Sequence, residues 1–218
     1  VAFDGTTQGA NVTVTSGSTL ATAISASTAT TQVIATTGDL QLTATNGGIG
    51  FGVAHLQATV GDVLLQSQTT TTVKTVVAGS DFQSLGNGVF DTATAGASIL
   101  AGDNILIDHA GTVTYRGVLE GDDILINTAA TSANALLASG TSASLTARTG
   151  DVELVSAGGI NVVASPIVAQ TGNVLLTAGG NTNVGQISAG MNIESNGNGL
   201  FDTTTGKLIE ATGDVVLN

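Results

Sequence analysis

The chain of 218 residues contains no cysteine and no tryptophan, and it is poor in proline and charge. It has one proline, 3% aromatic and 9% charged residues, whereas about a quarter of an average soluble domain is charged. Without cysteine it can form neither disulfides nor thiolate metal sites. Low charge combined with 42% hydrophobic residues is the opposite of a disordered composition. We therefore expect a packed chain.

Basic residues are the scarcest charged class. Four of them, Lys74, Arg116, Arg148 and Lys207, face sixteen acidic residues, which gives a net charge of −12. A surface of that sign repels phosphate backbones and anionic lipid headgroups. No stretch approaches the roughly 20 consecutive apolar residues of a membrane-spanning helix. We therefore expect neither nucleic acid as a partner nor insertion into a membrane.

The sequence is instead rich in glycine, with 30 residues, and it contains an internal duplication. When the chain is shifted by 111 positions, the segment 84–94, Ser-Leu-Gly-Asn-Gly-Val-Phe-Asp-Thr-Ala-Thr, falls on 195–205, Ser-Asn-Gly-Asn-Gly-Leu-Phe-Asp-Thr-Thr-Thr. Before Gly48 the offset becomes 112. We predict two tandem copies, residues 1–112 and 113–218, that form one continuous rod.

A smaller unit recurs inside each copy: a glycine, then Asp, Asn or a small residue, then alternating aliphatic residues. The recurring glycines are Gly9, Gly38, Gly61, Gly79, Gly102, Gly121, Gly150, Gly172, Gly190 and Gly213. Their spacings are 29, 23, 18, 23 and 19 residues, followed by 29, 22, 18 and 23. Steps of about 22 residues with strand-like alternation are typical of a solenoid. We predict five coils per copy, with the longer loops in the steps after Gly9 and Gly121.

The segment from Gly150 to Gln170 shows the expected path of one coil, because Gly, Ser and Pro separate three short β runs. Alternation places Val152 and Leu154 on the core side and Asp151 and Glu153 outside. Crossover connections between parallel strands are right-handed in the great majority of cases. The predicted fold is all-β: a right-handed parallel β-helix of about ten coils with three short strands each, roughly 48 Å long. One alternative stays open, a short helix at residues 132–139.

The pattern Thr-Gly-Asp-Val-x-Leu-x-x-x-Gly-Gly-Ile at residues 149–160 resembles the repeats of filamentous-haemagglutinin-like exoproteins and other large repetitive bacterial surface adhesins. The resemblance covers most of the chain and implies a secreted β-helical shaft. The secretion domain of those exoproteins carries an Asn-Pro-Asn motif, whereas the single proline here, Pro166, follows Ser165. The resemblance therefore implies shaft rather than secretion domain.

An acidic residue follows many of the coil glycines and is the most repeated polar feature. These residues are Asp39, Asp62, Asp103, Asp122, Asp151 and Asp214. One hypothesis is that these carboxylates bind calcium between stacked coils, since that ion takes carboxylate and carbonyl oxygens as ligands. Turn chemistry is the interpretation we favour, because Asp and Asn side chains bond their own backbone at corners and tolerate unusual φ angles. We expect no resident cofactor, and calcium remains the alternative.

Two loops, 86–91 and 197–202, are the best-preserved part of the duplication. Their polar side chains could hold a ligand or a metal, and the candidate donors are Asn87, Asp91, Asn198 and Asp202. A packing role explains the same sequence, with Asn-Gly forming a turn and Phe90 and Phe201 filling the core beneath it. We favour the packing role.

The histidines His55 and His109 have no counterpart in the second copy, where Pro166 takes the place of the first, so we do not expect either to be catalytic. Glu120 and Asp122 could share a face as an acid and base pair, but no Lys or Arg repeats with them. Strand alternation would point Asp123 the other way.

Threonine clusters raise a further option, a flat ice-binding array. They occur at Thr69–Thr72 and at Thr28, Thr30 and Thr31. Such an array needs Thr at matched positions on successive coils, whereas these clusters sit in particular coils. Exposed Thr is more simply a β-forming residue that stays soluble.

Together these features predict a non-catalytic structural or adhesive shaft segment of a long extracellular repeat protein at the cell surface. A filament or surface-layer subunit that stacks end to end is the alternative in the same class. A polysaccharide-acting β-helix enzyme is the alternative in another class. We expect end-to-end association or a longer parent protein, with a host or cell-surface glycan or protein as a further candidate partner.

Overall fold

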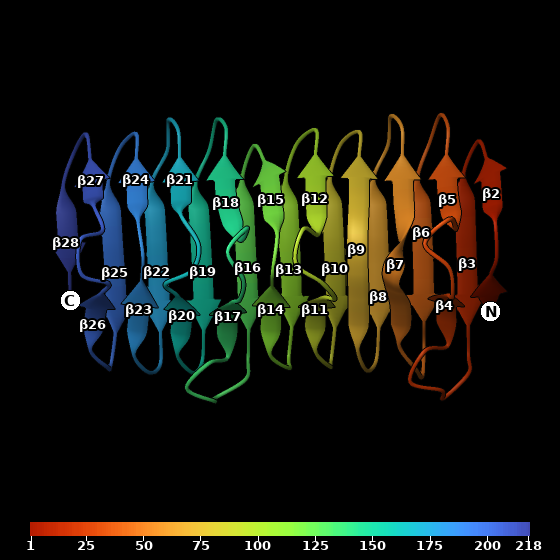
Figure 1. The fold of residues 1–218 in the computed structure, drawn as a ribbon, viewed down its shortest axis with the longest axis horizontal. Coiled ribbons are helices and arrows are strands. Elements are labelled where there is room, and N and C mark those ends of the chain that lie inside the picture. Colours follow the sequence, from red (N-terminus) through yellow and green to blue (C-terminus); the bar gives the residue numbers. More distant parts are fainter.

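The structure, a computed structural model, describes residues 1–218 as an all-β parallel solenoid of about ten turns. Figure 1 shows the coils side by side along the long axis, with the two termini at opposite ends. The chain contains no helix, and hence none that is long and apolar enough to cross a membrane. The predicted fold class is confirmed in these terms.

Ten parallel strands form the first of two sheets. They are β3 (Val12–Ser16), β6 (Leu40–Ala44), β8 (Val63–Ser67), β10 (Phe82–Gly86), β13 (Ile105–His109), β16 (Ile124–Thr128), β19 (Val152–Ser156), β22 (Val174–Ala178), β25 (Ile193–Gly197) and β28 (Val215–Leu217). Each strand pairs in register with the strand of the next coil, so the sheet runs unbroken from one end of the rod to the other.

The second sheet has 18 strands in two parallel ladders, and the long strands β7 (Ile49–Ala58) and β9 (Thr71–Ala78) belong to both. One ladder also contains β1 (Ala2–Phe3), β4 (Ile24–Ala26), β11 (Phe90–Thr92), β14 (Val113–Tyr115), β17 (Leu136–Ala138), β20 (Ile160–Val162), β23 (Thr182–Val184) and β26 (Phe201–Thr203). The other contains β2 (Thr6–Gly9), β5 (Gln32–Ala35), β12 (Ser98–Ala101), β15 (Val118–Gly121), β18 (Ser144–Ala147), β21 (Ile167–Ala169), β24 (Ile187–Ala189) and β27 (Ile209–Ala211).

Strand alternation builds a single core between the sheets. In β19 the side chains of Val152 and Leu154 are fully buried, while Glu153 between them is partly exposed, as predicted. The in-register pairing repeats this alternation of buried and exposed positions from coil to coil. Val152, for example, lies between Ile124 and Val174 of the neighbouring coils. One cluster of 49 buried residues results, so the rod has one hydrophobic core rather than two.

The longest excursions join β3 to β4 and β16 to β17, and both extend from the same edge of the rod (Figure 1). They fall in the steps after Gly9 and Gly121, where longer loops were predicted. The helical alternative for residues 132–139 is wrong, because Leu136 lies in β17, between Val113 and Ile160 of the adjacent coils. Pairing with two strand edges outweighs the helix propensity of a short Ala- and Leu-rich segment.

Candidate functional site

A row of Asp and Asn side chains, one per coil, follows the corner that precedes the first sheet. We call this row the Asx seam; it consists of Asn11, Asp39, Asp62, Asp81, Asn104, Asp123, Asp151, Asn173, Asn192 and Asp214. The Oδ1 atom of each member except Asp214 accepts a hydrogen bond from the backbone N–H of the next member, at 2.6 to 3.3 Å. The seam links all ten coils.

The seam exists because the corner leaves a backbone donor without a carbonyl partner. The carbonyl of Asp62 accepts from the N–H of Leu40 at 2.9 Å, and its own N–H is satisfied only by the side chain of Asp39. An unpaired N–H is costly, so a short side-chain acceptor is selected at this place. The preceding glycine is required by close approach, since a Cβ on Gly61 would lie 2.2 Å from Asp39 Oδ1.

Four of the six predicted aspartates, Asp39, Asp62, Asp151 and Asp214, are seam members. The other two, Asp103 and Asp122, lie one residue too early, and Asn104 and Asp123 take their places. In those coils an extra residue separates the glycine from the seam member. The same spacing occurs at Gly79-Ser80-Asp81, which is why the sequence pattern did not predict Asp81. The prediction that these side chains bond backbone groups at a corner is confirmed, but the predicted partner, their own backbone, is wrong, because the bonded N–H belongs to the neighbouring coil.

The carboxylates of the seam do not converge on one point. No group of three or more His, Asp or Glu side chains comes together in a geometry that would hold a metal ion. Successive members lie one coil apart, which separates equivalent atoms by about 4.8 Å. Each seam member offers one carboxylate or amide group per coil, whereas calcium takes 6 to 8 oxygen ligands.

The two duplicated loops, 86–91 and 197–202, differ in the contacts that their residues make. Phe90 is fully buried and lies 5.5 Å, centroid to centroid, from the ring of His109. Phe201, its counterpart, is only half-buried because its coil is the last one. Asp91 pairs with Arg116, and Asp202 accepts a hydrogen bond from the N–H of Thr203 at 2.8 Å. The packing role is confirmed for Phe90.

The amides of these loops lie at the surface. Asn87 is exposed and donates through Nδ2 to Gln68 Oε1 at 2.6 Å, which joins two coils. Asn198 is also exposed, and its backbone N–H donates to the carbonyl of Ala178. In each loop the Asn and the Asp bond to different partners rather than to a common point. The geometry therefore does not support the hypothesis that these loops bind a ligand or a metal.

His109 is a core residue with 1% of its surface exposed. Its Nδ1 lies 3.2 Å from the carbonyl of Gly88 and its Nε2 3.0 Å from Ser84 Oγ. A carbonyl can only accept, so Nδ1–H donates to Gly88 and Nε2 accepts from the Ser84 hydroxyl. Burial lowers the pKa of His109 to about 4. A serine–histidine pair with both members buried is inaccessible to substrate, and we assign it to packing.

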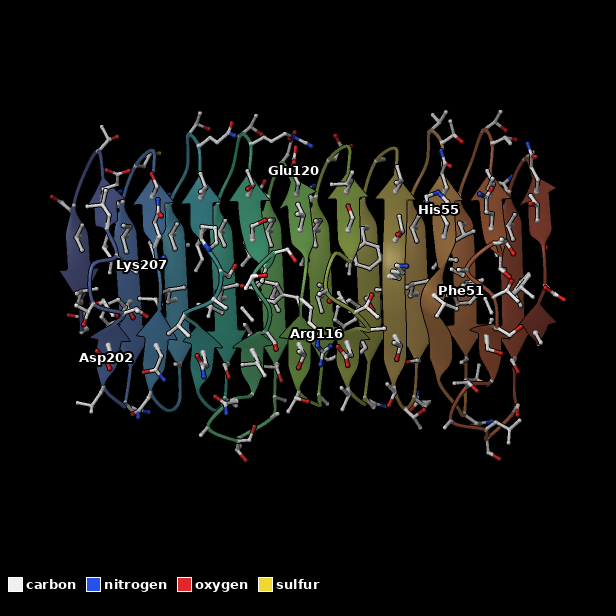
Figure 2. All side chains as sticks on the ribbon, in the orientation of Figure 1. Phe51, His55, Arg116, Glu120, Asp202 and Lys207 are labelled. Atoms are coloured by element: carbon white, nitrogen blue, oxygen red, sulfur yellow. The ribbon has the colours of Figure 1, made fainter.

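His55 lies on β7, far from His109 in the sequence, and is partly exposed (Figure 2). Its Nε2 atom is 3.2 Å from Gln57 Oε1 on the same strand. No acidic side chain bonds to its ring. The structure therefore does not bring the two histidines into a common site.

Both arginines of the chain join coils at the boundary between the two copies. The guanidinium of Arg148 donates to Asp122 Oδ1 at 2.9 Å and lies 3.5 Å from Glu120 Oε1. Its Nη2 also donates to the carbonyls of Ala101 and Gly102, at 2.8 and 2.6 Å. One side chain thus spans three coils.

Arg116 makes the second clamp at this boundary. Its guanidinium bonds the carboxylate of Asp91 and the carbonyl of Thr92, both in the preceding coil. Its backbone N–H also donates to Thr92 Oγ1 at 2.7 Å. Sequence reasoning missed both clamps. Arg148 stands 26 and 28 residues after its acidic partners, which is one coil, so coil spacing was the available signal.

The threonine clusters bond internally rather than forming an array. Thr31 is fully buried, and Thr28 Oγ1 lies 2.8 Å from its hydroxyl. Thr71 is also buried, with its hydroxyl 2.7 Å from Ser67 Oγ. The outward residue Thr72 has Gly50 and Asp91 as its neighbours on adjacent coils. No row of matched threonines follows from either cluster.

No family model, curated protein or solved structure matches this chain.

The largest hollow on that surface is an open groove of about 540 Å³ where β6, β8, β10 and β13 end. Its polar lining includes Thr43, Gln66, Gln68, Asn87 and Asp108. Four of these are already linked across coils, Gln68 to Asn87 and Thr43 to Gln66. Amide and hydroxyl groups in a shallow groove suit a ligand rich in hydroxyl groups, such as a glycan.

Proposed function

We propose that the chain is a non-catalytic shaft segment of an extracellular, repetitive surface adhesin. The resemblance of residues 149–160 to haemagglutinin-like repeats supports this proposal. The observation that carries it is the continuity of the stack, in which the seam and a ten-stranded parallel sheet run through every coil. Function then resides in length and in the surface that the shaft displays.

The direction of the hydrogen bonds supports a mechanical role. In a solenoid the bonds between neighbouring strands lie along the rod axis, and here the seam adds one side-chain bond per coil in the same direction. Pulling on the two ends therefore loads several parallel bonds and the packed core at every junction. Such a rod resists extension and bending.

The placement of the best acidic pair supports a non-catalytic role. Glu120 and Asp122 both face the guanidinium of Arg148, whose Nη2 donates to two backbone carbonyls. A general acid and base need freedom to exchange protons with a substrate. Here the pair holds an arginine that ties coils together.

The enzyme alternative is tested by incubating residues 1–218 with a panel of acidic and neutral polysaccharides and assaying new reducing ends. We expect no turnover. The contradicting outcome is turnover that Asp122→Asn abolishes and Asp103→Asn preserves, because Asp103 contacts Ser80 rather than Arg148. The shaft role is tested by stretching single molecules held at both ends. High-force unfolding in coil-sized steps is expected, and unfolding at very low force would contradict it.

The polar groove gives the adhesive part of the proposal a specific surface. A glycan array probed with residues 1–218 is expected to show weak binding that Asn87→Ala reduces and Asn198→Ala preserves. These two asparagines are equivalent in the duplication, but only Asn87 lines the groove. Binding that is unaffected by Asn87→Ala would place any adhesive surface elsewhere.

A further inference from the structure

The outer face of the first sheet carries aliphatic side chains along the middle of the rod. Two residues of each strand point outward, and the in-register pairing aligns them into two rows. Row one consists of Gln41, Leu64, Gln83, Leu106, Leu125, Glu153, Leu175 and Glu194. Row two consists of Thr43, Gln66, Leu85, Asp108, Asn127, Val155, Thr177 and Asn196. The aliphatic members of both rows are all partly exposed.

This face is flat, long and poor in charge. Figure 1 shows the strands of successive coils side by side with little rotation between them. The two rows hold three of the sixteen acidic residues of the chain and no basic residue. Eight strands of five residues cover about 38 by 17 Å, or about 650 Å². Two such faces in contact bury roughly 1,300 Å², which is in the range of specific protein–protein interfaces.

The residues of this face are arranged symmetrically about the boundary between the two copies of the duplication. Taken outward from that boundary, the successive pairs of row one are Leu106 and Leu125, Gln83 and Glu153, Leu64 and Leu175, and Gln41 and Glu194. Those of row two are Asp108 and Asn127, Leu85 and Val155, Gln66 and Thr177, and Thr43 and Asn196. Every aliphatic residue is thus matched with an aliphatic residue, and every acidic residue with an amide. A surface with this pattern is complementary to itself under a two-fold rotation.

We propose that two molecules of this chain pair side by side and antiparallel through this face, with the two-fold axis at the boundary between the repeats. Leu106 of each molecule then lies opposite Leu125 of the other. Glu153 lies opposite Gln83, whose amide can donate to the carboxylate. Within one molecule Asn127 Nδ2 already donates to Asp108 Oδ1 at 2.8 Å, which is a contact of the same kind.

The inference rests on the proposed adhesive role and names a partner for it. Shafts anchored on two facing cells run in opposite directions where they meet, so antiparallel pairing joins cells that carry the same protein. Because the contact lies along the sides of the rod, it leaves the shaft free to continue at both ends.

Other arrangements of the same two faces match less well. If the rods ran in the same direction, the two-fold axis would lie along them and reverse the strands, so row one would face row two and Leu106 would face Asp108. A shift of antiparallel rods by one coil would place Glu153 against Leu64 or Leu106. A carboxylate buried against leucine loses its water without gaining a partner. The pattern therefore specifies the direction and the register of the pair.

Two properties of the molecule modulate this pairing. The net charge of −12 on each molecule opposes their approach. Salt screens that repulsion, so the pair should become tighter as the ionic strength rises. Row two also lines the polar groove, and pairing covers it. The glycan binding proposed above therefore belongs to the unpaired rod.

The first experiment measures sedimentation and small-angle scattering of residues 1–218 over increasing concentration, at low and high salt. A dimer is expected whose cross-section grows while its length stays that of one rod. Leu106→Glu should raise the dissociation constant of the dimer at least about tenfold, since a charge would enter an apolar contact. Leu137→Glu is the matched control, because Leu137 is a partly exposed leucine of β17 on the second sheet, and it should leave association nearly unchanged.

The second experiment tests direction and register. Gln83→Lys places a cation opposite Glu153 on each side of the axis and should lower the dissociation constant about threefold or more. Gln32→Lys changes the net charge equally on β5 of the second sheet and should have a smaller effect. Because the chain has no cysteine, the variants Gln83→Cys and Glu153→Cys each carry one thiol. A bis-maleimide that spans the roughly 10 Å between packed sheets should join the two variants when they are mixed, and neither variant to itself.

A single 21.3 kDa species at all concentrations and salt conditions overturns the inference. So does a dimer that is twice as long as the monomer, or a dimer that Leu106→Glu does not weaken more than Leu137→Glu. Cross-links that form as readily within each cysteine variant as in the mixture overturn the antiparallel register. The stretching test uses single molecules and the glycan array uses dilute protein, so the proposed function and this pairing can each fail without the other.

Discussion

A buried histidine such as His109 is unusual for a rod made of aliphatic side chains, and it makes stability depend on pH. The ring lies above Gly86, where a Cβ would come within 2.7 Å of the ring, so glycine makes room for it. Its pKa is about 4 in the folded chain and about 6.5 when unfolded. The unfolded state therefore binds the proton more readily, and stability is full above pH 6.5 and falls toward pH 4.

We expect the free energy of unfolding to fall by about 2 kcal/mol between pH 7.5 and pH 5 on account of His109, from linkage between the two pKa values. His109→Gln removes this titration while keeping a polar side chain near Ser84. Denaturant unfolding at both pH values measures the change for each protein separately. If the variant loses as much stability as the wild type over this interval, His109 does not titrate as inferred.

Two substitutions of Asp62 in the Asx seam distinguish the contribution of its acceptor oxygen to stability from the contribution of its charge. Asp62→Asn keeps the oxygen that accepts from the N–H of Asp81, and it removes one of three carboxylates on successive coils. We expect unchanged or slightly increased stability. Asp62→Ala leaves the N–H without its partner and should cost about 1 kcal/mol.

Chemical and thermal unfolding of the wild type and both variants, with and without millimolar calcium, check this prediction. The melting temperature should not respond to the ion in the wild type or in either variant. A calcium-induced rise that Asp62→Asn abolishes would instead assign a metal-binding role to the carboxylates.

At the level of the element, the boundary between the copies is held by side chains that the first copy lacks. Thr36 occupies in the first copy the place of Arg148 in the second, and its hydroxyl reaches only the carbonyl of Gly9. Arg148→Thr should therefore cost about 1 to 2 kcal/mol, because charge-assisted bonds that link three coils are lost from a partly exposed site. Lys74→Thr, which removes the same charge from a residue without an ion pair, should cost less.

Equilibrium unfolding at low and high salt measures both variants. The loss in Arg148→Thr should shrink only in part at high salt, since two of its bonds go to carbonyl groups. A loss that vanishes completely at high salt would mean that the carbonyl bonds contribute nothing.

The elements were largely predictable from the sequence, whereas the contacts between them were less so. The three apolar segments between Gly150 and Gln170 are strands, as predicted, because the alternation of apolar residues and the corner glycines both indicate strands there. The seam was found only in part, because a glycine marks the corner but not the residue that follows the corner, as Gly102-Asp103-Asn104 shows. The clamps of Arg116 and Arg148 depend on which coil lies above which, and local pattern does not contain that information.

At the level of the whole molecule, each coil pairs its strands only with the neighbouring coils, and Arg148 alone reaches further, so stability should vary along the rod. In such an array, an end coil is held on one side and opens at lower free energy than a central one. Here the asymmetry is increased, since both arginine clamps lie near the centre and the last coil leaves Val215 and Leu217 half exposed.

Hydrogen exchange followed by mass spectrometry measures this gradient directly. At low protein concentration, amides of β28 and β26 should exchange fastest, and those of β13 and β16 slowest. Equal amide exchange rates in all coils would show that the rod unfolds as one cooperative unit. The coupling free energy between coils would then exceed the difference in local stability between the ends and the centre of the rod.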